Sequence, residues 1–256
     1  MSATTAMTGE PRLCDFAHAS PTLVEDRDMQ QRAESKFVVS EATAAALVLA
    51  LHGQFAVLPA GNALVASYRS LYFDTNDLSF FHAHRRGRRV RHKVRIRHYP
   101  DRELSVLEVK TRRSERHTVK VRRPREYGDS TFGPDDLDFV RQYCGPTDDL
   151  RPQVWIAYRR VTLLGLRSPE RVTFDTHLDL GRAHGHGQFR HAVVIEVKQP
   201  RLDHHSVAMQ QLRIAGCRSG WMSKYCTAIA LTSPDVRANH LMNRMRQLKA
   251  VGTWTH

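Results

Sequence analysis

The chain of 256 residues lacks the features that mark membrane, secreted and disulfide-rich proteins. Its longest apolar run covers residues 44–51, well short of the roughly 18 residues that a membrane-spanning helix needs. The first 20 residues contain no basic start followed by an apolar stretch, so the sequence predicts no signal peptide. The four cysteines have no Cys-x-x-Cys spacing, which is typical of reduced thiols. We therefore expect a cytoplasmic protein without a transmembrane segment.

Acidic residues are also fewer than basic ones. The chain has 26 Asp and Glu against 39 Lys and Arg, which gives a formal net charge of +13. An excess of this size favours an anionic partner, because it attracts and concentrates polyanions. At this level nucleic acid, a membrane surface and polyphosphate all remain open.

The distribution of periodic segments predicts one large domain with two flanking pieces. Residues 1–28 show no periodicity and are expected to form a flexible N-terminal arm. Residues 29–232 form the domain itself, and residues 233–256 a C-terminal helix and tail. Ser233-Pro234-Asp235 supplies the cap, first-position proline and acidic first turn of that last helix. Further helices are expected over residues 40–52, 133–144 and 203–215.

Alternation of apolar and polar residues predicts eight or nine strands. The helices are inserted between groups of strands instead of alternating with them, which favours an antiparallel barrel with a few covering helices, in the α+β class. The expected strands cover residues 32–39, 68–75, 89–99, 104–112, 118–122, 153–164, 171–178, 191–199 and 224–231.

An acid-x-Lys pattern occurs three times, at Glu34 and Lys36, Glu108 and Lys110, and Glu196 and Lys198. Residues two apart on a strand point to the same face, so each copy places a carboxylate beside an ammonium group. Ion pairs on a solvated sheet would explain the copies one by one. Together with further basic residues at spacing two they predict one enclosed charged cavity, with the apolar faces turned outward beneath helices. The charged face would carry Lys36, Arg69, Lys93, Arg95, Arg97, Lys110, Arg112, Lys120, Arg122, Arg160 and Lys198.

Other polar and aromatic residues are assigned more modest roles. Tyr72, Phe73, Trp155 and Phe174 are expected to pack between barrel and helices, and Asp175 to order a turn or pair with an arginine. The aromatics mostly alternate with the charges, which counts against nucleic acid as partner, since such modules place rings on the basic face. Paired histidines without a nearby cysteine do not indicate a zinc site. The run of arginines in residues 85–89 is either a flexible basic hairpin tip or a landing site for polyanions.

The ordered series of motifs resembles the vacuolar transporter chaperone (VTC) domain, which is part of the triphosphate tunnel metalloenzyme superfamily. Each motif alone is weak, whereas the series spans about residues 32–231. The matching segments are RAESKF (32–37), SLYFDT (70–75), KVRIRHY (93–99), LEVK (107–110), VKVR (119–122), AYRR (157–160), RVTFD (171–175), IEVK (195–198) and SKY (223–225).

The resemblance implies a tunnel barrel that binds a triphosphate with Mg²⁺ or Mn²⁺ and, in the best-known members, makes inorganic polyphosphate from ATP. By position, Glu196 would hold the metal, with Glu108 and Glu34 as further metal positions. The residues implied to act on the transferred phosphates are Lys36, Arg95, Arg97, Lys110, Lys120 and Arg160. The residues implied to bind substrate are Arg69, Lys93, Arg122, Tyr158, Lys198 and Lys224.

Two departures from related patterns limit this implication. The longer Glu-x-Glu-x-Lys run of the hydrolase and cyclase branch would need an acid at Arg32, which disfavours assignment to that branch. The chain also has no room for the inositol-phosphate sensing domain of the eukaryotic polymerases. Polyphosphate synthesis is therefore the favoured function. A triphosphate hydrolase on the same fold, and a binding module for polyphosphate or RNA, remain alternatives.

Overall fold

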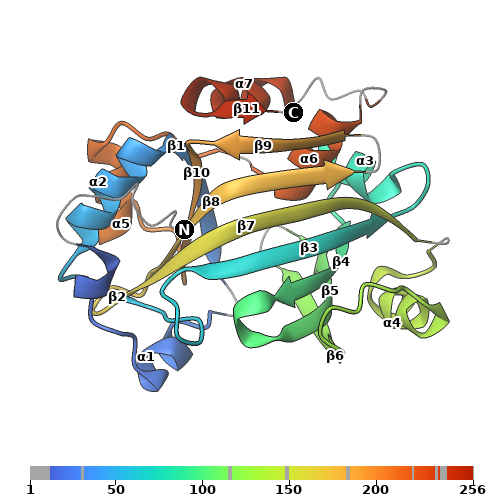
Figure 1. Ribbon diagram of the computed structural model, residues 1–256, viewed down its shortest axis with the longest axis horizontal. Helices are drawn as coiled ribbons and strands as arrows, with labels where there is room; N and C mark the ends of the chain where they lie inside the picture. Colours follow the sequence, from blue (N-terminus) through green and yellow to red (C-terminus); the bar gives the residue numbers. More distant parts are fainter. Residues whose placement is uncertain are drawn as a thin grey trace.

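The computed structural model describes residues 12–29, 32–114, 117–147, 150–182, 185–220, 222–233, 236 and 241–255. Its main feature is one antiparallel sheet in which eight strands follow the order β1-β10-β8-β7-β3-β4-β5-β6 (Figure 1). These strands are β1 (Ala33–Ser40), β3 (Ala66–Asp74), β4 (Arg91–Tyr99), β5 (Leu104–Arg112), β6 (Thr118–Arg125), β7 (Arg151–Gly165), β8 (Arg171–Arg182) and β10 (Ala192–Gln199). Three short strands, β2 (Phe55–Val57), β9 (Gly185–Arg190) and β11 (Thr253–Thr255), extend it. The predicted antiparallel α+β architecture is confirmed.

Helices cover this sheet from several sides (Figure 1). The longer ones are α2 (Glu41–Leu51), α4 (Pro134–Cys144), α5 (Val207–Ile214), α6 (Lys224–Thr232) and α7 (Met242–Val251). Shorter ones are α1 (Pro21–Asp26) and α3 (Ser79–Arg85), with two 3-10 turns at Leu13–Asp15 and Pro100–Arg102. None of the described helices is long and apolar enough to span a membrane.

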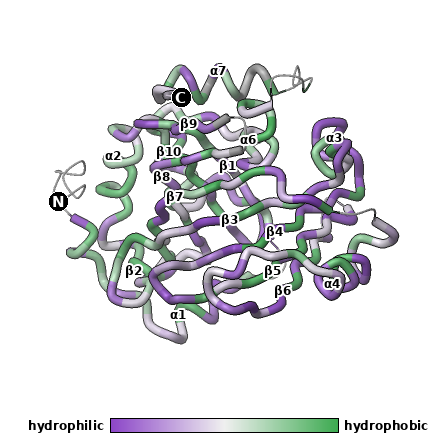
Figure 2. The backbone as a smooth tube through the Cα atoms, turned by 45° about the vertical axis from the view of Figure 1, so that its right-hand side comes forward, coloured by the Kyte–Doolittle hydropathy of each residue, from purple (hydrophilic) through white to green (hydrophobic). Residues whose placement is uncertain are grey.

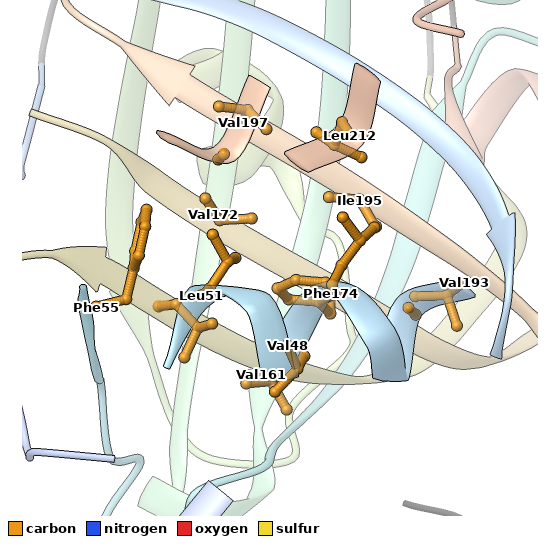
Figure 3. Close-up of a cluster of buried hydrophobic side chains, with 14 of the residues drawn as sticks. Val48, Leu51, Phe55, Val161, Val172, Phe174, Val193, Ile195, Val197 and Leu212 are labelled. Atoms are coloured by element: carbon orange, nitrogen blue, oxygen red, sulfur yellow. The ribbon is translucent and has the colours of Figure 1, made fainter. Parts of the chain in front are cut away.

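The outer face of β1, β10, β8 and β7 is apolar and lies beneath α2 and α5. Phe174, Ile195 and Val197 point away from the charged neighbours in their strands and contact the apolar sides of these helices (Figure 3). The hydroxyl of Ser40 accepts a hydrogen bond from the backbone N–H of Thr43, which caps α2 where the sequence predicted its start. A second apolar layer, which includes Phe73, Val94 and Leu107, covers the outer face of β3, β4 and β5 beneath α4.

Helix α6 occupies part of the opposite, inner face of the sheet. Its buried side chains pack on inward-pointing residues of β7, β8 and β10, such as Ile156 and Val194. Residues 224–231 were predicted as a strand, and that prediction is wrong. The hydroxyl of Ser223 accepts from the N–H of Cys226 and starts a helix instead. A short apolar run of this kind has no period that separates a strand from a buried helix.

The sheet curls until side chains from distant strands meet on its inner face. Lys110 on β5 lies 3.9 Å from the carboxylate of Glu34 on β1, although five strands separate β1 from β5 in the sheet order. Within the described residues no backbone ladder joins β1 to β6, so the curled sheet is barrel-like but not closed.

The N-terminal segment differs from the expected loose arm over its described part. Residues 12–28 contain a 3-10 turn and α1, and Ala17 and Ala19 exchange backbone hydrogen bonds with Val57 of β2. Phe16 is buried in the outer apolar layer. The start predicted for the C-terminal helix, residues 233–235, lies mostly outside the described residues; α7 follows at Met242–Val251.

Candidate functional site

Charged side chains collect on the inner face of the curled sheet, because they alternate with the outward apolar residues along each strand. In β4, Lys93, Arg95 and Arg97 point inward, whereas Val94 and Ile96 pack outward. Figure 2 shows hydrophilic and hydrophobic stretches mixed along neighbouring strands of the sheet. We call the inward set the charged cluster. Its cations are Lys36, Lys93, Arg95, Arg97, Lys110, Lys120, Arg122, Arg160, Arg171, Lys198 and Lys224, and its carboxylates are Glu34, Glu108, Asp175 and Glu196.

Glu108 is the carboxylate with the most cationic partners in the charged cluster. It is 1% exposed and accepts from Arg95 Nε at 2.6 Å and from Lys120 Nζ at 2.6 Å. Arg122 Nε, on a side chain that is 60% exposed, adds a third contact at 3.1 Å. Burial alone would raise the pKa of Glu108, but Arg95, Arg97 and Lys120 hold it well below its usual value. The carboxylate is therefore ionised and fully engaged by cations.

A second buried carboxylate, Asp175 on β8, links a strand to the start of α6. Arg160 donates to it through two nitrogens, at 2.5 and 2.7 Å, and Lys224 donates to the same group. Burial raises the pKa of Asp175, and the two cations outweigh that effect and lower it. The expectation that Asp175 pairs with an arginine is confirmed. The pairing also fixes where the first turn of α6 lies.

Arg97 differs from Arg95 because no carboxylate lies within ion-pair distance of it in the described part of the chain. It is 5% exposed and donates to Ser70 Oγ and Tyr158 Oη, both at 3.0 Å. Its guanidinium also lies 5.0 Å from the ring centre of Tyr68 and 5.9 Å from that of Tyr99. Aromatic faces stabilise a cation without neutralising its charge. Arg97 thus keeps its full charge for an external anion.

Tyrosines line the inner face to an extent that the sequence did not predict. Tyr72 was expected to pack as an apolar residue, but its hydroxyl accepts from Arg95 at 2.6 Å and its ring stacks on Tyr225 of α6. Burial raises the pKa of Tyr72, yet Arg95 and Arg97 bring it down to about 8. Phe73 and Phe174, by contrast, lie in the outer apolar layers as expected.

The N-terminus of α6 points into the charged cluster. Lys93 donates to Ser223 Oγ at 2.9 Å, and Lys36 lies 3.4 Å from the carbonyl oxygen of Met222. Burial lowers the pKa of Lys93 to about 8. A helix N-terminus carries partial positive charge and favours phosphate nearby. Lysine ammonium groups and backbone dipoles therefore act together at this end of the cluster.

Glu34 and Glu196 are the carboxylates best suited to a divalent metal ion. They lie diagonally on the paired strands β1 and β10, and the nearest cation to Glu196, Lys198, lies 3.9 Å away. Burial raises the pKa of Glu196, but Lys198 and Lys36 hold it well below its usual range. Two adjacent carboxylates fit Mg²⁺ or Mn²⁺, which take hard oxygen ligands and complete their shell with water and substrate phosphates. The described residues hold no group of three or more acidic, His or Cys ligands.

The structure brings fourteen of the fifteen predicted site residues onto the inner face. Arg69 is the exception: it lies on the outer face, 4.2 Å from the ring centre of Trp155, because Ser70 and Tyr72 take the inward positions of β3. Sequence reasoning missed Arg171 as a member of the cluster. Its Nε is buried without a hydrogen-bond partner. The spacing of two and four residues from Thr173 and Asp175 could have identified it.

Replacing Glu108 by Gln should destabilise the protein by roughly 3–5 kcal/mol, since it leaves buried cations without their anion. The same change should tighten the binding of inorganic tripolyphosphate, because one competing carboxylate is lost. Chemical denaturation and calorimetry measure the two effects. Asp138→Asn, which breaks an exposed pair with Arg141, is the control and should cost less than about 1 kcal/mol. Loss of tripolyphosphate binding in Glu108→Gln would contradict the role given to Glu108.

Tripolyphosphate affinity should fall as the pH rises through about 8, the pKa to which burial lowers Lys93. Below that pH the ammonium is present and binds phosphate; above it the free protein loses the charge, so binding must take up a proton. Lys93→Arg should remove the part of this pH dependence that comes from Lys93, because the guanidinium stays charged. Lys120 and Lys198, whose pKa values burial lowers to about 7 and about 8, would keep the rest. Calorimetry in buffers of different ionisation enthalpy measures the proton uptake. An unchanged pH profile in Lys93→Arg would exclude Lys93 as its origin.

The chain matches a known family model and is similar in fold to solved structures. A search of curated proteins finds no match. Among solved structures, a candidate adenylate cyclase from Bacillus halodurans superposes with a TM-score of 0.50 at 15% identity, over 75% of this chain and 93% of its own. A candidate adenylyl cyclase from Hippeastrum, described as having a dominant triphosphatase activity, superposes with a TM-score of 0.47 at 16% identity, over 78% of this chain and 95% of its own. The family model of the VTC domain matches residues 31–128 and 141–233, and the chain therefore belongs to the VTC domain family.

Proposed function

We propose that this protein is a metal-dependent phosphotransferase that acts on a nucleoside triphosphate, and that it synthesises inorganic polyphosphate from ATP. The observation that carries the proposal is the unbalanced charge of the inner face. Eleven cations face four carboxylates there, and among the described residues neither Arg97 nor Lys93 has a carboxylate within 4 Å. Buried cations need anions near them, and a chain of phosphates supplies several in a row.

The arrangement suits phosphoryl transfer because that reaction needs alignment and charge neutralisation more than covalent help. A terminal phosphate oxygen of the growing chain would attack the γ-phosphorus of ATP. The bond to the β–γ bridging oxygen would break, and ADP would leave with that oxygen. The attacking oxygen is already an anion, so no general base is required. Arg97 and Lys93 would hold equatorial oxygens in this step, with Tyr158 orienting Arg97.

The neighbouring residues have supporting tasks in this proposal. Glu34 and Glu196 would hold Mg²⁺ or Mn²⁺, which when bound neutralises charge on the triphosphate oxygens. Glu108 neutralises part of the charge of Arg95 and Lys120, and Asp175 positions Arg160 and Lys224. The remaining predicted phosphate contacts, Lys36, Lys110, Arg122 and Lys198, line the same face. A cytoplasmic location stays a prediction from the sequence.

Purified protein with ATP and Mn²⁺ or Mg²⁺ should accumulate ADP and a long anionic polymer. Glu196→Gln should abolish turnover in a protein that still folds, as thermal unfolding verifies. Glu41→Gln, which alters an exposed pair with His191 outside the charged cluster, is the control. Release of free phosphate without polymer would instead indicate a triphosphate hydrolase, and no turnover at all a binding module. Full activity in Glu196→Gln would remove the metal assignment.

Arg97→Ala should lower kcat/KM for ATP by about a hundredfold or more, the usual effect of removing one preorganised donor to a developing charge. Arg69→Ala provides a matched comparison, since it removes a guanidinium from the other face of the sheet, on the strand that pairs with the strand of Tyr158. We expect Arg69→Ala to stay within a few-fold of the parent protein. Equal losses in the two variants would mean that the inner face does not select the substrate. Initial rates over a range of ATP concentrations decide between these outcomes.

A further inference from the structure

The segment between α3 and β4 carries a second group of arginines outside the charged cluster. Helix α3 ends at Arg85, and the chain turns at Gly87, which has a φ of 65°, before β4 begins at Arg91. Arg86, Arg88 and Arg89 are exposed in this turn. Figure 2 shows the hydrophilic stretch that runs from α3 toward β4. Left-handed backbone at Gly87 is easy for glycine, and it places arginines on both sides of the turn.

This group continues the inward row of β4 without a gap. Arg91 has the same strand parity as Lys93, Arg95 and Arg97, and it lies opposite Arg112 of β5 in the antiparallel register. His84 of α3 lies close to Lys93, Arg91 and Lys110, which together with burial lower its pKa to about 2. A neutral His84 therefore lies between the turn and the charged cluster. We call Arg85, Arg86, Arg88, Arg89, Arg91 and Arg112 the arginine rim.

The rim lacks the anions that its charge requires. Buried Nε atoms of Arg85 and Arg91 have no hydrogen-bond partner. No carboxylate of the described residues lies within 4 Å of any rim guanidinium. Arg91 and Arg112 lie directly opposite each other on the paired strands β4 and β5, and two like charges in such a pair are destabilising. Donors that are both buried and unpaired mark a place where an external acceptor is missing.

The local side chains favour a polyanion without bases. The two phenylalanine rings of α3, Phe80 and Phe81, are 8% and 0% exposed and pack into apolar layers. Single-stranded nucleic acid is held by exposed rings on which bases stack, in addition to backbone charges. Of the large apolar side chains near the rim, only Val90 is exposed in the described residues, and it offers no such platform. Guanidinium groups by themselves match chains of phosphate.

We propose that the arginine rim binds the phosphate chain of inorganic polyphosphate beyond the triphosphate held in the charged cluster. This inference rests on the proposed function, since it takes polyphosphate to be the occupant of the inner face. A triphosphate that fills the charged cluster leaves the rim empty. A longer chain that starts at Arg97 and follows the row of β4 passes Arg91 and reaches the turn.

The test compares the binding of a short and a long phosphate chain to two variants that have lost the same number of positive charges. Arg86→Gln/Arg88→Gln/Arg89→Gln changes only exposed rim residues. The matched control is Arg201→Gln/Arg213→Gln/Arg218→Gln, which removes the same charge around α5, on the far side of the molecule from α3 (Figure 1). The Kd values of inorganic tripolyphosphate and of long-chain polyphosphate are measured by calorimetry over a series of salt concentrations. Thermal unfolding verifies that each variant is folded.

The rim variant should bind tripolyphosphate with an unchanged Kd. It should bind long-chain polyphosphate about tenfold more weakly, and the affinity for this ligand should depend less on salt concentration because phosphate contacts are lost. The control variant should match the parent protein for both ligands. Equal weakening in rim and control variants, or no weakening in either, would overturn the proposal. The proposal would also be overturned if a single-stranded RNA bound the parent protein as tightly as polyphosphate and if its binding were weakened as much in the rim variant. Failure of the parent protein to bind tripolyphosphate would instead refute the proposed function.

An Arg91→Gln variant extends the test to the half-buried part of the rim. It removes one of the two facing guanidinium groups, so the protein should become more stable without ligand and lose long-chain affinity. A structural role for Arg91 would give lower stability instead. Unchanged long-chain affinity would exclude Arg91 from the site.

Discussion

The structure depends on holding many like charges together on one face of a curled sheet. The repulsion is limited in two ways. Buried carboxylates form ion pairs with several cations at once, as Glu108 does with Arg95, Lys120 and Arg122. Tyrosine rings and hydroxyls stabilise the cations that have no acid partner, as they do for Arg97. Both devices leave a net positive charge, which is what makes the inner face a site for polyanions.

The apolar outer faces make this arrangement possible. Burial of residues such as Phe174 and Ile195 beneath α2 and α5 supplies the hydrophobic free energy that the inner face cannot provide (Figure 3). Because side chains alternate along a strand, each outward apolar residue also fixes the inward direction of its charged neighbours. The sheet thus positions its phosphate-binding groups by packing on the side away from them.

Helix α6 divides the inner face into an apolar part and a charged part. Its apolar side packs on β7, β8 and β10, and its N-terminus carries Ser223 and Lys224 into the charged cluster. Tyr225 connects this helix to the rest, since its ring stacks on Tyr72 and its hydroxyl donates to the buried carboxylate of Asp74. Asp74 also accepts from the first N–H groups of α3. The buried carboxylate of Asp74 therefore accepts hydrogen bonds both from α6, which contributes to the charged cluster, and from α3, which leads into the arginine rim.

The sequence by itself determined the eight strands of the main sheet order, their two faces and most of the charged cluster, because a period of two is a local property that needs no tertiary contact. It also indicated that Glu34, Glu108 and Glu196 lie among lysines. Only the tertiary structure decided that residues 224–232 form a helix, because a short apolar run fits either state. The register of β3 against β4 and β7 turned Arg69 outward and Tyr72 inward, since tyrosine suits either face and the choice rests on partners such as Arg95. The pairing of neighbouring strands likewise separated the carboxylates: it places Arg95 and Arg122 opposite Glu108, and it places Glu34 diagonal to Glu196 on β1 and β10.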